Sequence, residues 1–201
     1  MKWAQDQEVH IMSMSWTIKE KDGNRTGADN LKTAIEEAAK RGIILFCASD
    51  DIGMFKDARA LPASSDTKMI KKVGSCNENG DVSGFVNKNN VDYLLPGEKL
   101  DGVKDWKSED KGSSASTALA SGLAALFLYC LERHGYNKED LANSRMIALF
   151  DKLKISPTEG ALVDVTELLN EASAAHDPVR ILADRIREKV TDELRRDGRG
   201  T

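Results

Sequence analysis

The segment Lys111–Leu131, KGSSASTALASGLAALFLYCL, joins a cluster of glycine and small hydroxyl residues to a long apolar run. Residues 114–133 predict a long helix that ends before Gly135. The run is long enough to span a bilayer, but its first half is rich in Ser, Thr, Gly and Ala. A buried core helix is therefore the preferred interpretation.

Two serines at the start of this helix, Ser113 and Ser114, have two interpretations. Serine is a common N-cap residue, which is the simpler one. The first turn also carries unpaired backbone N–H groups and the positive end of the helix dipole. Those N–H groups can stabilise an oxyanion if a serine hydroxyl attacks a carbonyl. Residue types alone favour the cap.

The residues before this helix alternate between strand and helix patterns. Apolar runs predict strands at 9–16, 43–49, 69–77 and 91–100, and an amphipathic pattern predicts a helix at 27–42. A strand, a helix and an apolar strand in succession predict a βαβ unit whose parallel strands are covered on both faces. The predicted fold class is α/β, a mostly parallel sheet with helices on both faces in three layers.

The chain after this helix reads as helical. Helices are predicted at 138–154, 164–175 and 179–196, and the last two are highly charged. The helix at 179–196 is interpreted as a surface helix with one buried stripe, with a partner-helix or coiled-coil role as the alternative. We therefore predict a core domain at 1–155 and a charged helical extension at 156–201.

Composition excludes several function classes. The 201 residues carry a net charge of −4, so no basic field attracts the chain to nucleic acid. No CxxC pair indicates a metal site, and the phosphate-binding patterns GxGxxG and GxxxxGK[ST] follow none of the predicted strands. We expect no cofactor and no metal. Three separated cysteines and an N-terminus without an apolar leader predict reduced thiols, a cytoplasmic location and no membrane association.

Five segments together resemble subtilisin-like serine proteases, the peptidase S8 family. GSSASTALASG, 112–122, resembles the nucleophile segment G-T-S-M-A-T-P-H-V-A-G, and the strand VHIMSMSW resembles V-I-N-M-S-L-G. GIILFCASDD resembles the strand that ends in A-A-G-N, and 61–85 and 91–100 resemble two later family segments. The segments also resemble subtilase-like domains of large intracellular fungal proteins. The resemblance implies a subtilisin-like sheet and Ser114 as the nucleophile of peptide-bond hydrolysis.

The resemblance also implies substrate-binding residues. Ser15, Trp16 and Thr17 fall on the M-S-L-G strand that lines the family's peptide cleft, and Ala48 and Ser49 fall on the opposite wall. We expect a peptide or protein substrate to lie beside these strands by β-pairing. Trp16-Thr17 replaces the family's Leu-Gly, and Trp16 is expected either to reshape the pocket or to pack in the core.

The sequence departs from the family at the other catalytic positions. Subtilases use Asp, His and Ser in that order, and the first two precede the M-S-L-G strand. No D-S-G, D-T-G or H-G-T motif occurs here, and His10, His134 and His176 are interpreted as surface or packing residues. The resemblance thus implies that the N-terminal part of the domain is missing. The chain alone is predicted to be inactive, and an upstream segment or separate chain would supply Asp and His.

An acidic residue, Asp50, falls where the family has the asparagine that donates to the oxyanion, and a register slip of one residue would place Asp51 there. An ionised carboxylate cannot donate a hydrogen bond, and removal of one such donor lowers turnover by about 10²–10³-fold. Asp50 would serve only if protonated, which burial favours; its simpler role is to cap the loop. The alternative function is therefore an inactive subtilase-like module that binds other proteins.

Overall fold

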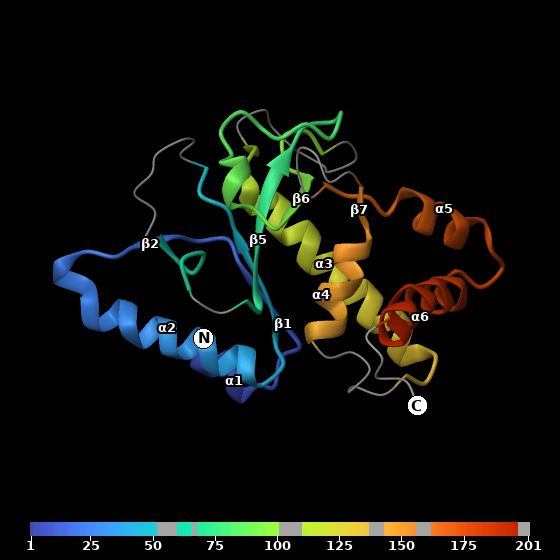
Figure 1. The fold of residues 1–201 in the computed structure, drawn as a ribbon, viewed down its shortest axis with the longest axis horizontal. Helices are drawn as coiled ribbons and strands as arrows, with labels where there is room; N and C mark the ends of the chain where they lie inside the picture. The colour runs from blue at the N-terminus through green and yellow to red at the C-terminus, as the bar shows by residue number, and fades with distance from the viewer. Residues whose placement is uncertain (52–59, 66–67, 101–109, 137–142, 156–161, 197–201) are drawn as a thin grey trace.

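The computed structural model describes residues 1–51, 60–65, 68–100, 110–136, 143–155 and 162–196 (Figure 1). All later structural statements concern these ranges. The strands are β1 Ile11–Met14, β2 Ile18–Lys19, β3 Ile44–Ala48, β4 Ala60–Leu61, β5 Ile70–Cys76, β6 Tyr93–Pro96, β7 Lys154–Ile155 and β8 Leu162–Val163. The helices are α1 Lys2–Asp6, α2 Arg25–Lys40, α3 Ser113–Arg133, α4 Asn143–Lys152, α5 Thr166–Ala174 and α6 Pro178–Arg196.

The main sheet has six strands in the order β1-β3-β5-β6-β8-β7. The strands β1, β3, β5, β6 and β8 pair in parallel, each with the next. At one edge, β7 pairs antiparallel with β8. β1 and β3 with the intervening α2 form the predicted βαβ unit. The predicted α/β class with a mostly parallel sheet is therefore confirmed. β1 occupies the other edge of the sheet and pairs with β3 alone among the described strands.

The side chains of β3 show how the sheet is covered on both faces. Leu45 and Cys47 pack with α2 on one face, in a cluster that includes Ile35. Ile44 and Phe46 point to the opposite face, into the cluster formed with α3, α4 and α6. Every residue of β3 is buried, because its alternate side chains enter two different cores. The three predicted layers are thus present.

Helix α3 runs through the centre of the larger core (Figure 1). By length and composition it meets the criterion for a membrane-crossing helix, a test that core helices also pass. Its buried positions include Ala120, Ala124 and Phe127, which pack with strand residues such as Phe46 and Val73. The fold therefore uses α3 as a core helix, in agreement with the prediction from its composition.

Several predicted elements need correction. The first strand is shorter than predicted, and only Met12 and Met14 are buried in it, while Ser13 is exposed, because β1 lies at the sheet edge. The short elements α1, β2, β4, β7 and β8 were not predicted, since two to five residues carry too little periodicity to detect. The first residues of the helix predicted at 138–154 lie outside the described ranges, and α4 is described from Asn143.

The C-terminal helices pack against the same core as α3. Leu182, Ala183 and Ile186 of α6 are buried in that cluster, together with Leu168 of α5. α6 thus has the predicted buried stripe and charged outer surface. The boundary proposed near residue 155 stays a prediction.

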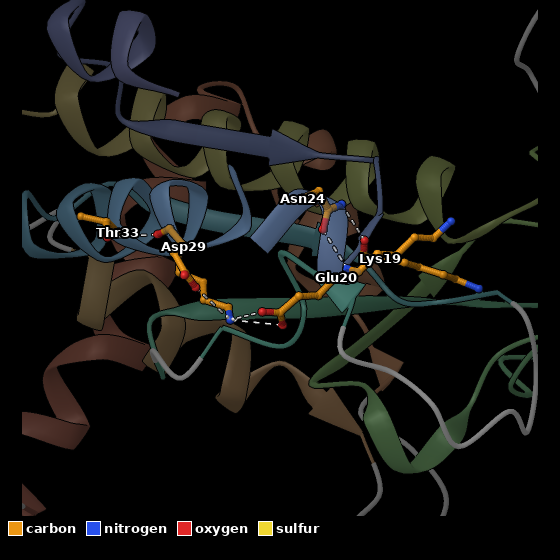
Figure 2. A network of polar contacts seen from close by, with 7 residues as sticks. Lys19, Glu20, Asn24, Asp29 and Thr33 are labelled. Atoms are coloured by element: carbon orange, nitrogen blue, oxygen red, sulfur yellow. Dashed lines mark hydrogen bonds and ion pairs between the residues drawn. The ribbon is translucent and has the colours of Figure 1, made fainter. Parts of the chain in front are cut away.

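Polar contacts attach the start of α2 to the turn that follows β2 (Figure 2). The side-chain amide of Asn24 donates to the Lys19 carbonyl at 3.0 Å, and its oxygen accepts from the backbone N–H of Lys21 at 2.8 Å. Lys32 on α2 pairs with Glu20 at 3.2 Å and, more weakly, with Asp29 at 3.8 Å. These contacts fix the connection between β1 and α2 on the side of the sheet away from α3.

Candidate active site

The carboxyl ends of the parallel strands meet the first turn of α3. In open α/β sheets, this edge is where ligands usually bind. Ser15 follows β1, Asp51 lies three residues beyond β3, and Gly97 follows β6. Each of them, or its side chain, lies against the segment 112–116, as the following contacts show. The sequence therefore folds so that the ends of three strands, β1, β3 and β6, lie around the predicted nucleophile segment.

Ser113 is the buried anchor of this turn. Its hydroxyl donates to one carboxylate oxygen of Asp51 at 2.5 Å, and its backbone N–H donates to the other at 2.8 Å. The same hydroxyl accepts from the backbone N–H of Ser75 at 3.2 Å. Ser113 thus joins the start of α3 to the segment after β3 and to β5. The carboxylate also fits the positive end of the helix dipole.

Ser114, the predicted nucleophile, is exposed beside Ser15. Its hydroxyl donates to the Ser15 carbonyl at 3.5 Å, and the Ser15 hydroxyl donates to the Ser114 carbonyl at 3.2 Å. The Ser114 hydroxyl is therefore accessible and oriented toward the residue that follows β1. A carbonyl accepts a hydrogen bond but cannot remove the proton, so within the described ranges this hydroxyl has no general base as its hydrogen-bond partner.

Buried hydroxyl groups hold the turn from the side of β5 and β6. Ser75 and Ser83 share a hydrogen bond of 2.8 Å, and Ser116 donates to the Leu95 carbonyl at 2.9 Å. Gly97 lies between them, and a Cβ there would be 2.3 Å from Ser116 Oγ and 2.6 Å from Ser75 Oγ. Sequence patterns did not identify Ser75 or Gly97 as site residues. Both lie in segments that resemble the family, 61–85 and 91–100, but that resemblance singled out neither residue.

The predicted substrate-binding residues lie at the ends of two adjacent strands. Ser15, Trp16 and Thr17 are exposed after β1, and Trp16 is 38% exposed, so the indole is not packed in the core. Ala48 and Ser49 are buried at the end of β3. A peptide would therefore meet the first three residues directly, while the second two lie beneath the surface. Their assignment to substrate binding stays a prediction.

The two acidic residues after β3, Asp50 and Asp51, make different contacts. The family resemblance placed Asp50 at the oxyanion position. Asp51, rather than Asp50, is bonded to Ser113, while Asp50 is half-buried beside it. Burial raises the pKa of the Asp51 carboxyl, the two bonds from Ser113 act in the opposite direction, and the charge of Asp50 raises the pKa further. The aligned role of Asp50 at the oxyanion position stays a prediction.

The histidines lie away from this turn. His10 precedes β1 at the end opposite Ser15, about 16 Å away for five extended residues. His134 follows the last turn of α3, about 30 Å from Ser114 along the helix. His176 lies between α5 and α6. All three are exposed, as expected for surface residues.

The three cysteines are free and buried. Burial raises the pKa of Cys47 to about 12 and that of Cys76 to about 11. Such thiols are poor nucleophiles at neutral pH. In the described ranges, no group of three His, Cys, Asp or Glu side chains is arranged to hold a metal ion. Serine is therefore the nucleophile candidate at this site.

The chain is similar in fold to several solved structures, among them two proteases and a macrocyclase. The protease domain of PatA, in a mutant form, superposes with a TM-score of 0.62 at 20% identity, over 82% of this chain and 60% of that domain. The prenylagaramide maturation protease PagA gives 0.60 at 19% identity, over 82% and 62%. The PatG macrocyclase in complex with peptide gives 0.61 at 16% identity, over 94% and 54%. At these identities the similarity shows the fold alone.

This chain therefore spans about 60% of the length of the structures that it resembles. A search of curated proteins found no match. The Subtilase family, peptidase S8, matches residues 1–146, which include the strand ends and serines of this site. On that match and the shared architecture, the chain belongs to the subtilase family.

Proposed function

We propose that this chain is the serine-bearing part of a subtilisin-like serine endopeptidase, with Ser114 as the nucleophile. The observation that carries the proposal is the position of Ser114, exposed on the first turn of α3 and bonded to Ser15 at the end of β1. An extended peptide beside Ser15–Thr17 would bring its carbonyl to this hydroxyl. The peptide bound by the PatG macrocyclase supports a peptide as the ligand.

The proposed reaction is an acyl transfer. Ser114 Oγ would attack the peptide carbonyl, its proton would pass to a histidine, and that histidine would protonate the leaving amine. Water then releases the acyl group. First-turn N–H groups of α3 stabilise the oxyanion, although Asp51 occupies the N–H of Ser113. Ser114's own N–H belongs to the same turn and is the donor that we assign to the oxyanion.

The histidine and aspartate would come from an upstream segment or a separate chain. Two neighbouring features mark where it would dock. β1 ends the sheet, so one of its edges has no strand beside it in the described ranges. Next to it, α3 exposes Leu119, Leu126 and Tyr129, the last at 53%. An added strand on β1 with a helix over these side chains would cover both features and reach Ser114.

A protein-binding module without activity is the second candidate. The contact that favours it is the carboxylate of Asp51 on the Ser113 N–H, since negative charge beside the developing oxyanion opposes the reaction. In that case the exposed surface of β1 and α3 would bind a partner without forming a catalytic centre.

Complementation distinguishes the two. The chain would be co-expressed with a family segment that carries the D-[ST]-G and H-G-T motifs, and hydrolysis of a fluorogenic peptide would be measured. The enzyme proposal predicts hydrolysis that Ser114→Ala abolishes. The control, Ser121→Ala, removes another α3 hydroxyl that bonds only within the helix, to the Thr117 carbonyl, and should retain activity. A stable complex with no hydrolysis would support the binding module instead.

A further inference from the structure

A small cavity lies at the opposite end of α3 from Ser114. It has a volume of about 210 Å³ and is bounded by the end of α3, the start of α4 and α6. Three aliphatic side chains form one part of its lining, namely Leu131, Ile186 and Val190. Four polar side chains also line it, namely Tyr136, Arg145, Arg187 and Thr191. The Arg187 guanidinium beside an aliphatic surface is suited to an amphiphilic anion.

The end of α3 places the tyrosine in this cavity. The carbonyl of Leu131 accepts from the backbone N–H groups of His134 and Tyr136, both at 3.1 Å. Gly135, at φ 79°, supplies the left-handed turn that this helix ending requires. The chain thereby turns back so that Tyr136 lines the cavity with Leu131. The ring position is a consequence of the helix cap.

The tyrosine ring in turn orients one arginine. The guanidinium of Arg187 lies over the Tyr136 ring, 5.5 Å from its centroid. A guanidinium held over an aromatic face is already partly ordered. It therefore loses less conformational freedom when it binds an anion. Arg145 approaches from α4 and lines the same cavity. The Arg187 guanidinium is thus positioned by the Tyr136 ring before any ligand arrives.

We propose that this cavity binds a small carboxylate with a short aliphatic body. The planar guanidinium of Arg187 matches a carboxylate through paired hydrogen bonds, and Leu131, Ile186 and Val190 would cover the aliphatic part. A compact inorganic anion has no apolar part to contact these three side chains. Two kinds of ligand carry a carboxylate beside an aliphatic group, namely a free short-chain acid and the C-terminus of a peptide.

This site is separate from the proposed catalytic serine. Leu131 is 17 positions after Ser114 on α3, about 26 Å along the helix axis. The proposal therefore stands or fails independently of peptide hydrolysis. Binding can be measured on the chain alone.

Titration with hexanoate, followed by calorimetry and by NMR of the Val190 and Thr191 methyl groups, tests the proposal. We expect saturable binding, methyl shifts at both residues, and much weaker binding of hexanol and acetate. Arg187→Gln should weaken hexanoate binding about tenfold or more, because a charge-assisted contact is lost. Arg180→Gln is the matched control, since Arg180 is on the same helix but does not line the cavity.

A peptide that ends in leucine, with either a free or an amidated terminus, distinguishes the sources. If only the free-acid peptide displaces hexanoate, the ligand is the C-terminal carboxylate of a peptide. If neither peptide displaces it, the ligand is a free short-chain acid. Absence of saturable hexanoate binding would overturn the proposal. So would equal binding of hexanol, or an equal loss in Arg180→Gln and Arg187→Gln, with circular dichroism confirming that both variants are folded.

Discussion

Asp51 holds Ser113 by both of its carboxylate oxygens, one on the hydroxyl at 2.5 Å and one on the backbone N–H at 2.8 Å. The two residues are 62 positions apart in the chain, and the contact joins the loop after β3 to the first turn of α3. Ser114, the next residue, takes its position from this turn. Asp51 is therefore a positioning residue for the proposed nucleophile.

Substitution of Asp51 by alanine should destabilise the fold. The buried hydroxyl and N–H of Ser113 would both lose an acceptor, which costs about 1–3 kcal/mol of the free energy of unfolding. Urea denaturation of the chain measures the change. Asp6→Ala, at an exposed position on α1, is the control and should change stability by less than about 0.5 kcal/mol. Equal effects of the two substitutions would contradict the role of Asp51.

Asp51 should also make stability depend on pH. Its pKa in the fold is raised, chiefly by burial, so the folded state holds this proton more tightly than the unfolded state does. The contribution of Asp51 is then complete below the ordinary Asp pKa of about 3.9 and is lost as pH rises through the folded value. We expect the difference in unfolding free energy, wild type minus Asp51→Asn, to fall as pH increases from about 4. A difference that rises with pH would show that the folded pKa is lowered.

Gly97→Ala should displace the start of α3. The added Cβ would lie 2.8 Å from the backbone carbonyl oxygen of Gly112, besides its contacts with Ser75 and Ser116. Backbone atoms cannot move as a flexible side chain does, so we expect a loss of about 1–3 kcal/mol. Thermal unfolding measures it. Gly84→Ala is the control, because its Cβ would have no neighbour within 4 Å; similar losses in both variants would exclude crowding as the cause.

Leu126→Lys should affect association while leaving the fold intact. Leu126 is 39% exposed on α3, so the unfolding free energy of the isolated chain should change by less than about 0.5 kcal/mol. Binding to the complementing segment, measured by calorimetry, should weaken about tenfold or more because a buried charge would replace an apolar contact. Leu169→Lys, an exposed leucine on α5, should bind like the wild type. Unchanged binding by Leu126→Lys would place the docking surface elsewhere.

The fold was largely predictable because its central elements have strong local patterns. The buried run of β3 and the amphipathic pattern of α2 each predicted its element to within two residues. The strand predicted at 9–16 is longer than β1, which spans Ile11–Met14. β1 lies at the edge of the sheet, and a local pattern does not show which strand takes that position. β8 was missed because two residues join the sheet by pairing with distant β6, a tertiary contact without a local signal.

The candidate site was less predictable for the same reason. The segment around Ser114 identified itself through its family resemblance, which the family match now supports. The contact between Asp51 and Ser113 follows no spacing rule, because it joins two residues that are 62 positions apart in the chain. The alignment placed Asp50 first in this region, and only the folded geometry shows which carboxylate contacts the helix.

Intact-mass spectrometry after treatment with a fluorophosphonate tests the central claim most directly, because the probe labels only an activated serine. The chain would be measured alone and with a segment that supplies the family's Asp and His. We predict no label on the chain alone, and one label per chain in the complex, at Ser114, that Ser114→Ala removes and Ser121→Ala retains. Stoichiometric labelling of Ser114 in the isolated chain, or labelling of a different serine in the complex, would contradict this account.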